Sequence, residues 1–496
     1  MTSFKIPLAC GLRHCLDGRT LTAVLAATLL TTGCAVGPTY QRPSVQNVAV
    51  FKQAGDWIAA VPADLLKRGP WWELFNDPVL SSLAARVDVS NQNIAAATAA
   101  VAQARAVVAE QRAGFFPSLS IGGGANRSGG GSEGASSAGN QGSQRSTGNN
   151  FSASLGAAWE PDVWGRLQRI GTSAQALGAA SAADLAAARL SAQGQLAINY
   201  LSLRQQDVQS ALLTRTLAGF ARALQITQNR YAAGIVAKSD VLQAQTQLAN
   251  AQADLSGVIR ARAQLEHAIA VLVGAAPANF ALATSPQYEA VVPAVPVGVP
   301  STLLQRRPDI AAAERRVLSA NEQIGIAESA YYPSFNLNAS VGAGASRLAQ
   351  LFSAPSVLWA LGVTTAQVLF DGGATGARVD GAQAAHAQAI ARYRQVVLTA
   401  FEEVENQLTA AQTLQAQQAL RVQASTAADQ VEQQAFNRYT AGRASYLEVI
   451  TAQTSALSAR RAVAQAISDR QTTAVALIQS LGGGWQAGNS DQNAIK

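Results

Sequence analysis

The chain has 496 residues, of which 48% are hydrophobic and only 14% are charged, and its formal net charge is +7. About a fifth of the residues are alanine, which favours long helices, and 13 Phe, 7 Trp and 9 Tyr are too few for a thick aromatic core. The cations are scattered without a run of five, which argues against a nucleic-acid partner and is typical of solvated helix faces.

The first predicted element is a secretory signal over residues 1–33. Basic residues precede an apolar run at 21–30, which is too short to cross a membrane as a helix. Small residues then lead to Cys34, as in a bacterial lipobox, although Thr31 stands where leucine is usual. We therefore expect cleavage before Cys34 and a covalent lipid on it. The alternative is ordinary cleavage nearby, which leaves Cys34 as a free thiol.

Cys34 is the only cysteine expected in the mature chain, because Cys10 and Cys15 leave with the signal. No intramolecular disulfide is then possible, and the fold must rely on its size and on oligomerisation. Ala35 follows the cysteine, whereas retention in the inner membrane is usually associated with Asp at this position. We therefore expect sorting to the outer membrane, with a second element of attachment, because one acyl chain binds a membrane weakly.

The mature chain contains an internal duplication. The sequence RYAAG at 230–234 matches RYTAG at 438–442, and the same offset of 208 residues relates Gly274 to Gly482. Upstream, residues 115–118 match 331–334 at an offset of 216, so the first copy is about eight residues longer. We assign the extra residues to an exposed loop rich in Gly, Ser and Asn between Arg127 and Asn150.

Each copy has the same predicted order of helix, strand, loop, strand, very long helix, turn and returning helix. In the first copy an alanine-rich helix over 83–114 ends before Pro117, and strands are expected at 118–125 and 151–159. In the second copy the strands are expected at 334–345 and 357–370. Their signal is weak, as it is for strands that cross a membrane.

The very long helices, 165–232 and 375–440, contain no proline. About 67 residues at 1.5 Å each give a length of roughly 100 Å, which suits a coiled coil or a helical barrel. The returning helix of the first copy, 239–273, has an apolar heptad seam with Arg262 as its one charged member. The seam consists of residues 241, 248, 255, 262 and 269 together with 244, 251, 258, 265 and 272. An isolated antiparallel hairpin that lines nothing would carry the same seam.

Gly234 and Gly442 are expected at the hairpin tips, because glycine readily takes the left-handed conformation that ends a helix. These elements define the domain boundaries. They are a signal at 1–33, a lipid-anchored segment at 34–82, a first repeat at 83–274, a linker at 275–300, a second repeat at 301–485 and a tail at 486–496. Within the repeats we expect β-hairpins at about 115–164 and 331–370, and helical hairpins at about 165–273 and 374–481.

An ordered set of short motifs resembles the TolC-like outer-membrane factor family in its NodT-type lipoprotein branch. The most specific part is RRPDI at 306–310, followed by AERR at 313–316 and QIG at 323–325. Further matching motifs are CAVGPTY at 34–40, WW at 71–72, WEPDVWG at 159–165, YP at 332–333 and LFDGG at 369–373. The likeness extends from Cys34 to about Trp485.

The resemblance implies a homotrimer that is mostly α-helical with transmembrane β-strands. Each protomer would give four strands to a shared twelve-stranded β-barrel in the outer membrane, and the long coiled-coil helices would form a periplasmic α-barrel. The implied function is the exit duct of a tripartite efflux system that conducts drugs or other small solutes passively. Its partners would be a periplasmic adaptor and an inner-membrane RND-type pump.

No catalytic constellation is found in the sequence. The three histidines, His14, His267 and His386, are dispersed, and the glycine runs lack the ending of a phosphate-binding loop. We therefore expect no enzyme activity, no metal and no cofactor apart from the lipid on Cys34.

The gate is expected near the hairpin tips, which should also contact the adaptor. By resemblance Glu448 occupies a position where such channels carry a carboxylate, and three copies would form an anionic ring that selects cations. Arg438 and Arg443 are candidates to pair with Glu448, although a solvated helix face would equally explain an acidic residue there. Tyr439 is either a packing group or a gate latch. Asp240 is either a pore residue or a polar residue favoured by the helix dipole.

Two other functions remain open at this point. One keeps the fold and changes the cargo, as the outer-membrane duct of a type I protein secretion system. The other is a periplasmic adaptor lipoprotein, which also has a coiled-coil hairpin but lacks two β-hairpins. The transported substrate does not follow from the sequence.

Overall fold

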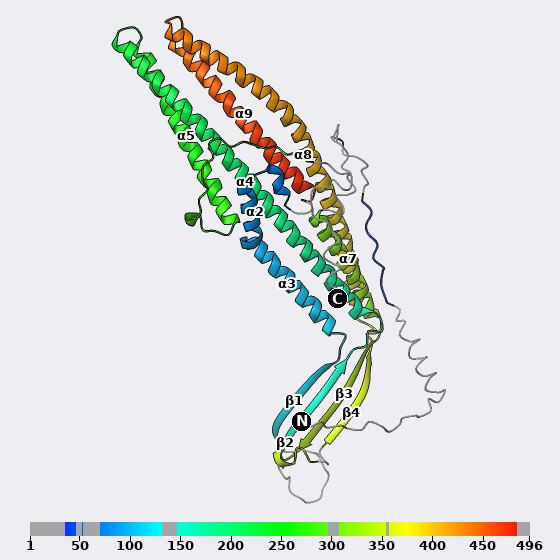
Figure 1. Ribbon diagram of the computed structural model, residues 1–496. Helices are drawn as coiled ribbons and strands as arrows, with labels where there is room; N and C mark the ends of the chain where they lie inside the picture. Colours follow the sequence, from blue (N-terminus) through cyan, green and yellow to red (C-terminus); the bar gives the residue numbers. More distant parts are fainter. Residues whose placement is uncertain are drawn as a thin grey trace, which may run out of the picture. The chain divides into compact units, whose positions relative to one another are not determined.

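The computed structural model describes residues 35–45, 52, 70–130, 146–295, 307–353 and 357–483 (Figure 1). The predicted signal over 1–33, Cys34 and the tail 486–496 lie outside the described residues, as do parts of the 34–82 segment, the 275–300 linker and the start of the second repeat. None of the described helices combines the length and the apolar character that a membrane-crossing helix needs.

The chain divides into two compact units, and each unit draws on both predicted repeats. The first consists of Met1–Gln41, Ala106–Gln175 and Leu318–Ala387. The second consists of Arg42–Arg105, Ala176–Val317 and Gln388–Lys496. The compact units therefore do not follow the order of the repeats along the sequence.

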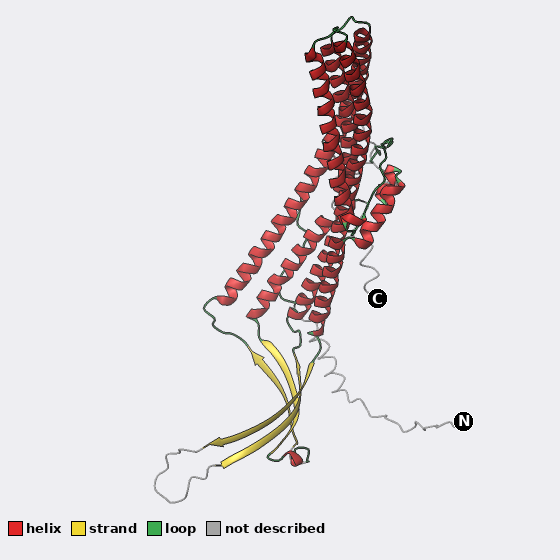
Figure 2. Ribbon diagram, turned by 90° about the vertical axis from the view of Figure 1, so that its left-hand side faces the viewer, coloured by secondary structure: helices red, strands yellow, loops and turns green. Residues whose placement is uncertain are grey.

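The first unit contains a four-stranded antiparallel sheet in the order β1-β2-β3-β4 (Figure 2). The strands are β1 (Ser118–Gly130), β2 (Ser146–Trp159), β3 (Ser334–Ala345) and β4 (Val357–Ala366). The two predicted hairpins are confirmed, and β3 has the predicted bounds.

Three strand ends differ from the prediction. The first hairpin runs further into the Gly/Ser-rich segment, because residues 126–130 and 146–150 pair in register across the two strands. Cross-strand pairing overrides the low strand propensity of Gly and Asn here. In contrast, β4 ends at Ala366 and not at Phe370, because Ala366 already lies opposite Ser334, the first residue of β3.

The two faces of the sheet differ in character. Since successive side chains of a strand point to opposite faces, residues aligned across the sheet share one face. One aligned row is Ile121, Leu155, Val341 and Trp359, and all four side chains are exposed. The neighbouring row on the other face is Ser120, Gly156, Ser340 and Ala360. One face is therefore exposed and apolar, and the other has small and polar side chains.

The two predicted helical hairpins are confirmed (Figure 1). The long helices α4 (Arg166–Ala232) and α8 (Ala374–Thr440) have 67 residues each. They are followed by α5 (Lys238–Leu272) and α9 (Tyr446–Ser480), which have 35 residues each. The boundary between the compact units falls within α4 and α8.

An aspartate fixes the start of each long helix. Asp162 accepts hydrogen bonds from the N–H groups of Leu167 at 2.9 Å and Gln168 at 2.7 Å. Asp371 accepts from the N–H and the hydroxyl of Thr375 at 2.7 and 2.6 Å. The hydroxyl of Thr375, followed by its N–H, holds the pKa of Asp371 below its ordinary value. Both carboxylates bind backbone N–H groups that a helix start leaves without partners. Their negative charge is also stabilised by the positive end of the helix dipole.

The prediction of one helix over 83–114 is wrong. The structure has α2 (Pro78–Ser90) and α3 (Gln92–Ala113), separated by Asn91. The side chain of Asn91 accepts hydrogen bonds from the N–H groups of Asn93 at 2.9 Å and Ile94 at 3.1 Å. The Asn91 backbone is extended, with φ −71° and ψ 125°, so this residue ends one helix and caps the next.

The heptad seam of α5 faces the interior of the second unit. Of its members, Val241, Ala244, Ala251, Val258 and Ile269 are buried, and Leu248, Leu255, Arg262, Leu265 and Leu272 are half-buried. A larger core nearby joins α2, α4 and α9 through residues such as Leu80, Leu203 and Val475. The other elements are η1 (Trp71–Phe75), which enters this core, the helix α7 (Pro308–Glu328), and three short 3-10 helices, η2 (Pro277–Asn279), η3 (Ser329–Tyr331) and η4 (Leu348–Gln350).

Candidate functional site

The turns at the two hairpin tips have the same backbone geometry. Gly234 and Gly442 have φ values of +72° and +73°, as predicted for left-handed helix ends. In the first tip the N–H of Ile235 donates to the carbonyl of Arg230 at 2.8 Å. In the second tip the N–H of Arg443 donates to the carbonyl of Arg438, also at 2.8 Å. Each glycine therefore closes a helix by satisfying its last carbonyls.

The helices that leave the tips begin differently. The Oγ of Ser445 accepts from the N–H of Glu448 at 3.4 Å and caps α9. The corresponding residue before α5 is Ala237, which makes no side-chain cap. The second tip is thus the better capped of the two.

Tyr439 is buried between the two hairpins. Its ring lies 5.5 Å from that of Tyr446, measured between centroids, and its hydroxyl lies 3.3 Å from the Oγ1 of Thr227. Tyr439 is packed in the interior, with 2% exposure, whereas the equivalent Tyr231 of the first copy is 46% exposed.

Arg230 joins the first hairpin to the end of α8. Its guanidinium lies 4.2 Å from the centroid of the Tyr439 ring and donates to the carbonyls of Tyr439 at 3.0 Å and Thr440 at 3.2 Å. A cation at the C-terminal end of a helix is favoured by the helix dipole. The sequence contained Arg230 only as part of the repeated RYAAG motif, and nothing in that motif indicates a contact between hairpins.

Asp240 lies in the first turn of α5, as expected, and influences the second hairpin. Burial raises the pKa of Tyr446 to about 12, and the negative charges that Tyr439 and Asp240 carry when ionised add to the rise. Tyr446 therefore stays neutral over a wider range of pH than an ordinary tyrosine.

Glu448 and Arg438 meet on the surface of the second hairpin. Their closest nitrogen and oxygen are 3.5 Å apart, and their side chains are 47% and 60% exposed. An exposed pair of this kind adds little stability. Of the two arginines expected near Glu448, Arg438 makes the ion pair, and Arg443 contributes the backbone bond described above. Both members of the pair line a groove of about 550 Å³ between α8 and α9, with Val431, Leu447 and Thr451.

A buried carboxylate explains the charged member of the α5 seam. Asp207 of α4 accepts from Arg204 at 2.9 Å, from Arg262 at 2.7 Å and from the N–H of Ser285 at 3.0 Å. The Asp207 side chain is only 1% exposed. Arg262 thus occupies a seam position as a hydrogen-bonded partner. Asp207 was not predicted, because only Arg204 lies near it in the sequence, while Arg262 and Ser285 lie 55 and 78 residues away.

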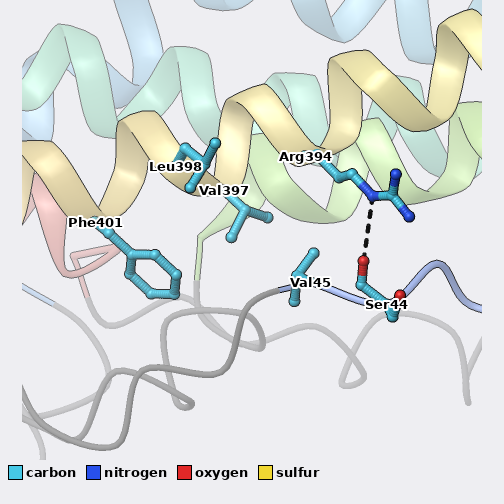
Figure 3. A pocket seen from close by; sticks show the side chains of 6 residues that line it. All are labelled: Ser44, Val45, Arg394, Val397, Leu398 and Phe401. Carbon is cyan, nitrogen blue, oxygen red and sulfur yellow. Dashed lines mark hydrogen bonds between the residues drawn. The ribbon is translucent and has the colours of Figure 1, made fainter.

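A second cavity, of about 430 Å³, lies against α8 (Figure 3). Val397, Leu398 and Phe401 line one side of it, and Ser44 and Val45 line the other. The Nε of Arg394 donates to the carbonyl of Ser44 at 3.2 Å. At this cavity Ser44 and Val45 of the second unit therefore lie against α8. In the part of the chain that the structure describes, no group of three His, Cys, Asp or Glu residues is placed to hold a metal ion.

Known proteins are similar to this chain in both sequence and fold. A family model for outer membrane efflux proteins matches residues 83–275 and 299–483. The probable efflux pump outer membrane protein TtgC of Pseudomonas putida is 28% identical over 481 residues, which cover 96% of this chain and 98% of that one. The outer membrane protein OprJ of Pseudomonas aeruginosa is 30% identical, with 94% and 96% covered. The solved structure of the outer-membrane channel OprN superposes with a TM-score of 0.83 at 31% identity, covering 91% of this chain and all of that one.

Proposed function

The chain belongs to the outer membrane efflux protein family, and we propose that it is the lipid-anchored, trimeric exit duct of a tripartite pump. Its relatives are outer-membrane components of efflux systems, and its location is the outer membrane with an extension into the periplasm. The fold class predicted from the sequence, mostly α-helical with transmembrane β-strands, is the fold of these channels.

The observation that carries the proposal is the sheet of the first unit. Its apolar face is exposed, and its outer strands, β1 and β4, each have a neighbour on one side only within the described chain. In lipid an unpaired strand edge is excluded, because each unsatisfied backbone group costs several kcal/mol. Three copies joined edge to edge would remove every free edge and place the polar face around an aqueous lumen.

Transport through such a duct requires a lined conduit and a gate, and no bond is made or broken. The energy comes from the inner-membrane partner, for which we propose an RND-type pump joined through a periplasmic adaptor at the hairpin tips. We therefore propose no catalytic role for any residue. The lipid on Cys34 is part of the proposal, supported by the signal-like sequence before it, and intact-mass measurement of the purified chain tests it directly.

Glu448 is the proposed selectivity residue of the gate. It is exposed, it lies in the first turn of α9, and its partner Arg438 is held only by a weak surface pair. Three carboxylates around one pore attract cations into it. The neutral Thr451, one turn further on, would leave Glu448 as the acidic position of this ring.

Single-channel recording in planar bilayers tests this role. The variant Glu448→Ala is expected to lower the preference for cations over anions severalfold and to weaken block by divalent cations. Asp254→Ala is the matched control, because Asp254 is 51% exposed, close to the 47% of Glu448, and pairs with Arg461 at 3.0 Å. Unchanged selectivity in the Glu448 variant, across pH and divalent cations, would exclude it as the gate residue.

Protein secretion by a type I system remains the alternative cargo on the same fold. The relatives reported above are components of efflux pumps, which favours small solutes. Genes for a proton-driven pump and an adaptor beside the gene for this chain would support efflux, and an ABC-type exporter beside it would support secretion. A periplasmic adaptor is disfavoured by the two β-hairpins.

A further inference from the structure

Residues 35–38, which directly follow Cys34, are held through their backbone. The N–H of Val36 donates to the carbonyl of Trp164 at 3.1 Å. The carbonyl of Val36 accepts from the Nε of Arg169 at 2.6 Å. The carbonyl of Pro38 accepts from Arg169 and from the side-chain amide of Asn321, both at 3.2 Å. We refer to residues 35–38 as the strap and to Arg169, Asn321 and Glu322 as its socket.

The socket contains a buried charge that the strap completes. Arg169 of α4 pairs with Glu322 of α7 at 2.8 Å, and each side chain is only 10% exposed. A buried ion pair is costly unless the remaining donors of the arginine are also bonded. The carbonyls of Val36 and Pro38 in the strap accept hydrogen bonds from two N–H groups of Arg169. Removing the strap would therefore leave a buried guanidinium short of partners.

Two glycines allow the strap to lie this close. Gly37 has a φ of +105°, and a Cβ there would lie 2.5 Å from the Cα of Gly325. A Cβ on Gly325 would in turn lie 2.3 Å from the Nε of Arg169. Both distances are shorter than any contact that a Cβ makes with a non-bonded atom. Gly37 and Gly325 belong to two of the motifs in the sequence, CAVGPTY and QIG, and this contact gives both motifs a physical reason.

The strap begins beside the segment that connects the sheet to the long helices. Trp164 and Gly165 connect β2 to α4, and a Cβ on Gly165 would lie 3.1 Å from the side chain of Ala35. The indole of Trp164 donates to the carbonyl of Pro333, just before β3, at 2.7 Å. Aromatic side chains are exposed around this junction, namely Phe116, Trp159, Tyr331, Tyr332 and Phe370. Exposed aromatic rings favour the boundary between lipid and water.

We propose that the socket is an internal binding site for the peptide backbone of residues 35–38, which fixes the acylated end of the chain at the aromatic boundary of the sheet. Arg169 acts as a positioning residue that holds the strap and touches no cargo. A fixed attachment point keeps the acyl chains at the depth of the membrane surface. A loose tether would instead let them move out into the periplasm. This inference rests on the proposed lipid at Cys34 and on the proposed membrane location.

A spin label on the strap tests the socket. Thr39 is exposed, so Thr39→Cys accepts a label without disturbing the contacts. The label is expected to be immobilised in the parent protein in detergent or lipid. Gly37→Ala should release it, because the added methyl collides with Gly325 while the Arg169–Glu322 pair stays intact. A released strap moves on the timescale of a chain terminus, so we expect a roughly tenfold shorter rotational correlation time.

Arg169→Lys changes the socket and leaves the strap unaltered, and Arg166→Lys is its control. Lysine keeps a charge beside Glu322 but cannot bond two carbonyls in the fixed geometry of the guanidinium. Arg166 lies one turn earlier in α4 and pairs with Glu160 at 2.7 Å. We expect release with Arg169→Lys and none with Arg166→Lys. A label that stays immobile in Gly37→Ala and Arg169→Lys, or that is already mobile in the parent, would overturn the proposal.

The parent chain without Thr39→Cys separates this inference from the lipidation proposal. In the expected mature chain Cys34 is then the only cysteine, so uptake of label reports a free thiol and the failure of lipidation. If label is taken up, the strap is measured with Cys34→Ser and Thr39→Cys behind a signal that does not require acylation. Conductance in bilayers reports the duct function independently of both.

Discussion

Arg230 and Arg438 occupy matching positions in the two repeats but bind different groups. Arg230 stacks on Tyr439 and donates to the last carbonyls of α8, so it connects the hairpins. Arg438 pairs with Glu448 within its own hairpin. The duplicated motif therefore preserves the turn, which its glycine defines, while the arginine has acquired a separate role in each copy.

The raised pKa of Tyr446 predicts a loss of stability in alkaline solution. Its value in the folded chain is about 12, compared with an ordinary value of 10. Ionisation therefore favours unfolding, and the contribution of the neutral phenol is fully present below pH 10 and lost as the pH rises through 12. Tyr446→Phe should lose less thermal stability than the parent between these pH values, as followed by circular dichroism.

The control for this measurement is Tyr231→Phe, which removes the phenol of an exposed tyrosine in the first hairpin. It should follow the parent curve. If Tyr446→Phe also follows the parent curve, the ionisation of Tyr446 is not coupled to unfolding.

At the scale of elements, Asn91 decides where two helices meet. Besides capping α3, its amide donates to the carbonyl of Leu272, the last residue of α5, at 2.8 Å. Asn91→Ala removes both interactions and is expected to cost about 1–2 kcal/mol. Hydrogen exchange in peptides that cover the start of α3 should then be about five- to thirtyfold faster. Asn93→Ala, at an exposed position two residues later, should leave exchange unchanged. Equal exchange in both variants would contradict the capping role.

The same residue shows where sequence reasoning ends. The long helices, the tip glycines and the four strands followed from proline positions, heptads and the duplication. A single Asn in an alanine-rich stretch gave no sign of a break, because one of the contacts that fix it, to Leu272, is 181 residues away. The strand ends in the Gly/Ser-rich segment were equally hidden, since only the opposite strand makes them extended. Among the site residues, the proximity of Glu448 and Arg438 was predicted, but the partners of Arg230 and Arg169 were not.

At the scale of the whole molecule, the free edges of the sheet predict the contact between protomers. A cysteine at Gly123→Cys in β1, combined with single cysteines stepped along 357–363 in β4, should form disulfides between chains. We expect covalent dimers and trimers on non-reducing gels for at least one pair.

The control pair lies within one sheet. Leu155→Cys and Val341→Cys are neighbours in register on β2 and β3, so they should give no covalent oligomer. Monomers alone from every pair of β1 and β4 positions would show that the sheets do not meet at these edges.

The position of the strap in its socket has a consequence for the order of events during export. Pro38 lies close to the expected start of the mature chain, yet it bonds to Asn321, 283 residues later. Contacts of such separation form late, because the intervening chain must first be delivered and closed into a loop. The N-terminal end therefore stays loose until the second repeat has crossed the inner membrane. Under the proposed lipidation, that interval is when the acylating enzymes reach Cys34, and completion of the fold then withdraws the same segment from access.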